Sequence, residues 1–83
     1  MTQVARSPKQ MGNLIQRARR QKGLTQTELA GLSGLRQELI SKIEGGHDGT
    51  KLSSIYTLFA ALDLDLLVAS RSQGVAVEIE DIF

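Results

Sequence analysis

The stretch "GLTQTELAGLSGLRQELISKIEGG", Gly23 to Gly46, decides the fold of this chain. Thr25 followed three residues later by Glu28 is a capping box, the signature of a helix start. Gly34 can take the left-handed backbone conformation of a tight turn, so we expect it to end this first short helix. Between the cap and the turn lies an apolar face made of Leu29, Ala30 and Leu32.

A second helix is expected from about Arg36 to Glu44. Counted from Gln26 as position one, a small residue is fifth, a glycine ninth and isoleucines fifteenth and eighteenth: Ala30, Gly34, Ile40 and Ile43. The small residue lets the helices cross closely, and the isoleucines form the buried side of the second helix. This spacing indicates a helix-turn-helix motif. It leaves an outward face of Gln37, Glu38, Ser41 and Lys42.

Helices are also expected on both sides of this motif. Ser7 followed by Pro8 predicts the start of a helix that ends at Gly23. A fourth helix is expected over roughly residues 53–62, after the loop "GGHDG". Its expected buried side chains are Leu52, Ile55, Leu58, Phe59 and Leu62.

The pattern changes at "LDLDLLVAS", which begins at Leu62 and is compatible with a β-strand. Leu64, Leu66 and Val68 would share one face of this extended segment. A lone strand cannot satisfy its own backbone hydrogen bonds. We therefore predict that it pairs with the same strand of a second copy, in a homodimer. The alternative is an extended tail that lies on its own helices.

Length and composition indicate one domain. We expect a flexible arm over residues 1–6, a domain over 7–70, and an acidic, apolar C-terminal tail over 71–83. The chain has no cysteine and one histidine, and it shows no phosphate-cradling motif, so we expect no metal, cofactor or enzymatic activity. No apolar run is long enough to cross a membrane, which favours a soluble intracellular protein.

Charge is unevenly distributed along the chain. Residues 1–51 hold nine of the ten Lys and Arg residues and four acidic residues, whereas residues 52–83 hold Arg71 and five acidic residues. Such asymmetry favours a basic face for a polyanion. Ordinary surface charge that happens to segregate would give the same counts.

The quoted stretch resembles the Xre, Cro and lambda-repressor class of helix-turn-helix proteins, over about residues 8–63. The resemblance implies about five packed helices and a dimer that places a recognition helix in the major groove of double-stranded operator DNA. Continuing through "KLSSIYTLFAALDLDLLVASR", residues 51–71, the chain is similar to HipB-type antitoxins. Those bacterial cytoplasmic proteins pair a strand between subunits, repress their own operon and neutralise a HipA-type kinase toxin.

The resemblance also implies site residues. The positions that face the major groove are Arg36, Gln37, Glu38, Ser41 and Lys42. Gln26 matches a phosphate-contacting glutamine, and Lys51 lies where the fourth helix often touches the DNA backbone. Arg19 and Glu44 match two positions that pair beneath the recognition helix. Arg20 is a further candidate for DNA contact.

Among these residues, Gln37 suits adenine and Arg36 suits guanine or a phosphate. Glu38 departs from the family pattern. It can accept from cytosine N4, or it can tether Arg36 or Lys42. Because an acid repels phosphate, we interpret Glu38 as a selectivity element that penalises non-specific DNA contact. Leu39 also departs from the pattern. It can meet a thymine methyl group or pack against the preceding helix, and we expect packing.

The leading hypothesis is a dimeric repressor that serves as antitoxin to a HipA-like kinase. A stand-alone regulator without a toxin is one alternative. A helical protein-interaction adaptor, which Glu38 alone favours, is another.

Overall fold

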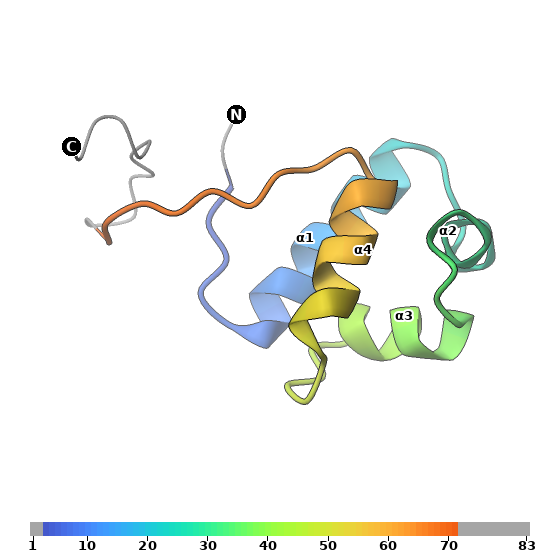
Figure 1. Cartoon of the computed structure of the whole chain (residues 1–83), viewed down its shortest axis with the longest axis horizontal. Coiled ribbons are helices and arrows are strands. Elements are labelled where there is room, and N and C mark those ends of the chain that lie inside the picture. The colour runs from blue at the N-terminus through green and yellow to red at the C-terminus, as the bar shows by residue number, and fades with distance from the viewer. Residues whose placement is uncertain (1–2, 72–83) are drawn as a thin grey trace.

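A computed structural model describes residues 3–71, which form four helices (Figure 1). Their bounds are α1 Pro8–Gln21, α2 Gln26–Ser33, α3 Gln37–Glu44 and α4 Leu52–Ala61. Within residues 3–71 there is no β-strand and no fifth helix. The prediction of a lambda-repressor-like helical fold is confirmed. The expectations for residues 72–83 lie outside the described residues.

The predicted start signals act where they were expected. The Ser7 hydroxyl accepts a hydrogen bond from the Gln10 amide at 3.1 Å. Thr25 and Glu28 form the reciprocal capping box, with hydrogen bonds of 3.0 and 2.9 Å. Gly34 is left-handed, with φ of 77°. α3 begins one residue later than predicted, because the backbone of Arg36 is still extended.

Every helix contributes to one hydrophobic core. Its buried members are Ile15, Leu29, Ile40, Ile43, Ile55, Leu58, Phe59 and Leu62. Leu39 packs against this core, as expected. Two expectations were wrong, because Leu32 is 64% exposed and Leu52 is 60% exposed. α2 turns the side carrying Leu29 inward and Leu32 falls off that stripe, whereas Leu52 is the first residue of α4, before the turns that reach the core.

α1 and α3 approach each other closely at Gly12. A Cβ atom on this residue would overlap the carbonyl oxygens of Ile43 and Glu44, the latter at 2.8 Å. Only glycine therefore lets the first turns of α1 pack against the end of α3. Gly46 lies at the same crossing, after the end of α3 and against Lys9 of α1. Its backbone is left-handed, with φ of 92°.

The predicted strand begins instead as a helix cap. Asp63 is left-handed, with φ of 58°, and the amide of Leu64 donates to the Phe59 carbonyl at 2.8 Å. This is a Schellman arrangement, and it packs the half-buried Leu64 against the core of its own domain. Leu64 is therefore not on a free apolar face. Beyond it the chain runs away from the helices (Figure 1), leaving Leu66, Leu67 and Val68 exposed.

The close approach at Gly12 gives a testable prediction. Gly12→Ala should lower the free energy of unfolding by about 1–3 kcal/mol, because backbone must move to admit the methyl group. Gly31→Ala is the matched control: it is also helical, but nothing lies within 4 Å of its added Cβ. That variant should gain up to about 1 kcal/mol from helix propensity. Urea denaturation followed by circular dichroism measures both, and equal effects would contradict the close-approach argument.

Candidate nucleic-acid interface

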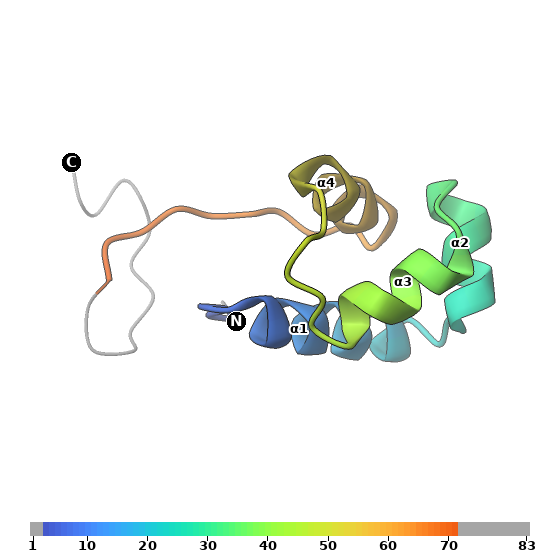
Figure 2. The same ribbon diagram turned by 90° about the horizontal axis from the view of Figure 1, so that it is seen from below.

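α3 lies on one side of the molecule, facing the viewer in Figure 2. Ile40 and Ile43 are buried on its inner side, and the predicted major-groove residues Glu38, Ser41 and Lys42 are exposed. Gln37 is half-buried, in the first turn of the helix. Glu38 forms no salt bridge with Arg36 or Lys42. Its carboxylate is therefore not a tether for these neighbours.

Beneath α3 lies a buried ion pair between α1 and α3. The Arg19 Nε donates to Glu44 Oε2 at 2.7 Å, and a second guanidinium nitrogen donates to Oε1 at 2.9 Å. The third nitrogen donates to the carbonyl of Leu24 at 2.7 Å, in the turn between α1 and α2. The Arg19 guanidinium thus connects α1 to α3 and to the turn that leads into α2. The family resemblance predicted the pairing of Arg19 with Glu44, but not the hydrogen bond to Leu24.

The ion pair is connected to α3's outer face through two glutamines. Gln26 Nε2 donates to Glu44 Oε1 at 3.1 Å. Gln37 Nε2 then donates to Gln26 Oε1 at 2.6 Å. The residues predicted for phosphate contact and for base recognition are therefore neighbours. The sequence pattern did not predict the hydrogen bond between Gln26 and Gln37, because glutamines eleven residues apart have no characteristic spacing.

The charge of Glu44 fixes the direction of this hydrogen-bond chain. An ionised carboxylate can only accept, so Gln26 must turn its NH₂ group toward Glu44. Its oxygen then faces Gln37, which must donate in turn. Each amide keeps one N–H free, and Gln37 also keeps its carbonyl oxygen. A side chain that offers one donor and one acceptor together matches adenine N7 and N6.

The titration of Glu44 reflects the same contacts. Burial raises the pKa of Glu44, but hydrogen bonds from Arg19, Gln26 and Gln16 outweigh burial and hold the pKa below its ordinary value of 4.5. The hydrogen bond to Glu44 likewise raises the pKa of Arg19. The pair is therefore ionised at neutral pH.

The helix starts differ in their capping. α1 and α2 begin with side-chain caps, whereas α3 and α4 have the cations Arg36 and Lys51 at the N-cap, without a side-chain hydrogen bond. α3 and the beginning of α4 lie at the same lower edge of the molecule in Figure 1. Free N–H groups and a positive dipole end suit an anion. Both predicted cations stand where they add to that potential.

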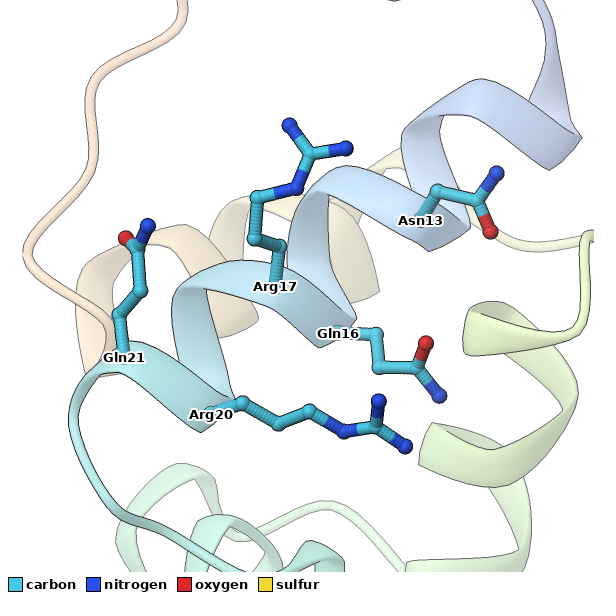
Figure 3. Close-up of a pocket in the computed structure, with 5 residues that line it drawn as sticks. All are labelled: Asn13, Gln16, Arg17, Arg20 and Gln21. Carbon is cyan, nitrogen blue, oxygen red and sulfur yellow. The ribbon is translucent and has the colours of Figure 1, made fainter.

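Arg20 belongs to α1. With Asn13, Gln16, Arg17 and Gln21 it lines a polar groove on that helix (Figure 3). Over residues 3–71, no cluster of His, Cys, Asp and Glu could hold a metal ion. None of the helices described is long and apolar enough to span a membrane.

The Helix-turn-helix family model matches residues 15–68. The chain is 33% identical to the antitoxin HipB of Escherichia coli O6:H1 over 78 residues, covering 92% of this chain and 83% of that protein. Among solved structures, it is similar to a HipB–O2 20mer complex, with a TM-score of 0.81, 32% identity, and coverage of 87% of this chain and all of the other. A HipA–HipB–O2–O3 complex gives a TM-score of 0.79, with 32% identity and coverage of 86% and 100%.

The ion pair predicts a stability change in acid. Because the folded-state pKa of Glu44 is lowered, its stabilisation is present above pH 4.5 and is lost as pH falls through the folded value. Glu44→Gln should lose about 3–5 kcal/mol at neutral pH, since it leaves the Arg19 charge unmatched. It should also flatten the pH dependence of the free energy of unfolding below about pH 5.

Urea titrations at several pH values measure this effect. Glu28→Gln is the control, because the backbone amide of Thr25 lowers the pKa of Glu28 at the surface. If Glu28→Gln flattened the curve more than Glu44→Gln, the ion pair would not be the main acid-sensitive contact.

Proposed function

Because the chain belongs to the helix-turn-helix family, in the group of the HipB antitoxins, we propose that it is the DNA-binding antitoxin of a HipBA-type operon. It binds operator DNA as a homodimer, represses its own operon and neutralises a HipA-like kinase. The observation that carries this function is a series of hydrogen bonds that runs from the Arg19–Glu44 pair through Gln26 to Gln37. It orients the Gln37 side chain for contact with a base, on the outer side of α3.

Base recognition falls to the first two turns of α3. Gln37 reads adenine through its remaining N–H and its carbonyl oxygen. Glu38, which is exposed and untethered, accepts from cytosine N4 and repels phosphates at sites that lack this base. Ser41 and Lys42 complete the groove-facing surface one turn further along.

Phosphates are held around this reading surface. The free N–H of Gln26 and the open helix starts at Arg36 and Lys51 provide three contacts that require no particular base. Such contacts supply most of the affinity and weaken with salt. A protein that binds operator DNA acts at the nucleoid, in the bacterial cytoplasm. This function requires neither a cofactor nor catalytic activity.

The segment after α4 supports the homodimer. Leu66, Leu67 and Val68 are consecutive, apolar and exposed, and in isolation such a run is unfavourable in water. The segment departs from the upper end of α4, whereas α3 lies at the lower edge of the molecule (Figure 1). Pairing two copies through this segment leaves both α3 helices free for DNA.

Anisotropy titrations with the DNA upstream of its own gene and with a shuffled duplex test the DNA-binding function. Gln37→Ala should lose about 1–3 kcal/mol on the operator and little on the shuffled DNA. Glu38→Ala should bind shuffled DNA more tightly and discriminate less. If wild-type protein bound both duplexes equally at every salt concentration, the repressor function would be wrong. Weaker binding of Glu38→Ala to all DNA would assign Glu38 a positioning role instead.

The antitoxin function predicts a stable complex with a HipA-like kinase encoded beside this gene. Co-expressed and purified through a tag on the kinase, the two chains should elute together, and the kinase should be inactive in the complex. Gln37→Ala should elute with the kinase as wild-type does, since its defect is confined to DNA. A kinase that elutes alone would leave a stand-alone regulator as the better description.

A further inference from the structure

The polar groove on α1, which we call the α1 groove, has positive charge and no negative charge among its lining side chains. Its cavity of about 440 Å³ is lined only by two arginines and three amide side chains: Asn13, Gln16, Arg17, Arg20 and Gln21. No acidic residue lines it, and no salt bridge engages Arg17 or Arg20 within residues 3–71. Two unneutralised guanidinium groups beside amide donors select an anion.

The groove has one side that faces the recognition helix. Gln16 and Arg20 lie one turn apart on α1, and both side chains extend toward α3, whereas Arg17 and Gln21 extend away from it (Figure 3). Gln26 donates to the Glu44 carboxylate at 3.1 Å, and Gln16 lies near enough to the same carboxylate to lower its pKa. Both amides therefore lie on the Glu44 side of α1. The Arg20 side of the groove thus continues the surface on which Gln26 meets DNA.

We propose that the α1 groove binds a phosphate of the DNA backbone, next to the phosphate contacted by Gln26, with Arg20 providing the charge and Gln16 a neutral donor. Arg20 can present two parallel N–H groups to the phosphate oxygens. Arg17, on the other side of the groove, contributes long-range attraction. This contact rests on the proposed function and extends the footprint of each subunit beyond α2, α3 and α4.

The continuity with Gln26 distinguishes a polymer phosphate from a free anion. A phosphate in a DNA strand arrives with its neighbours already held by Gln26 and by the helix starts, so its contact with Arg20 costs little additional ordering. A free phosphate ion has only the groove itself. The expected contact is therefore independent of base sequence but dependent on duplex DNA.

Ethylation interference with the full-length protein on its upstream DNA tests the contact. Modification of one phosphate per half-site should weaken binding of wild-type protein and have no effect on Arg20→Ala, and that phosphate should adjoin the one lost in Gln26→Ala. Arg20→Ala should also reduce the slope of log K against log salt by about 1 per subunit, equally on operator and shuffled DNA. Its melting temperature should equal that of wild-type, because Arg20 is exposed.

Lys22→Ala is the matched control. It removes the same charge from the C-cap of α1, outside the groove, and should keep every wild-type interference position. If Arg20→Ala showed every interference position of the wild-type protein, this inference alone would be wrong. The groove would then bind a free anion or a protein ligand instead. Absence of any wild-type footprint would overturn the proposed function and this inference together.

Discussion

The buried ion pair between Arg19 and Glu44 is the constraint on which the rest of this domain depends. A charge pair removed from water is stable only when its remaining donors and acceptors are satisfied. Here that requirement determines the path of the chain: one guanidinium nitrogen needs the Leu24 carbonyl, and one carboxylate oxygen needs the Gln26 amide. The turn into α2 and the start of α2 are therefore held in place by a contact between α1 and α3. Gly12 allows this contact by letting the two helices approach.

The same pair connects stability with the proposed recognition of DNA. A neutral amide can be flipped at little cost when its partners can both donate and accept, but a carboxylate cannot donate. The charge on Glu44 therefore sets the orientation of Gln26, and Gln26 sets that of Gln37. A base-reading side chain that is already oriented loses less conformational entropy when it meets DNA. The residue that we propose reads the base sequence is thus oriented by a buried carboxylate.

Much of this architecture could be predicted from the sequence, because it follows from local chemistry. The Ser7 cap, the Thr25 capping box and the Gly34 turn each depend on residues within one helical turn, and all three are present. The errors arise where distant contacts decide. Leu64 looked like a strand residue because the alternation of leucine and aspartate matches a strand, yet the same residues complete a helix cap against the core. Gly12 carried no signal, since its importance depends on a carbonyl more than thirty residues away.

The four helix starts differ in how much their caps contribute to folding stability. A side-chain cap contributes about 1 kcal/mol, and a cation at a helix N-terminus opposes the macrodipole. α2 satisfies both rules, and α1 has the cap but carries Lys9 in its first turn. α3 and α4 lack a side-chain cap and have Arg36 and Lys51 at the N-cap. Both cations stand at helix starts whose free N–H groups can donate to a phosphate oxygen. The first turn of α3 has Glu38 as its one acidic residue, and the first turn of α4 has none, so the charge of a bound DNA strand would offset part of the stability that the isolated domain forgoes.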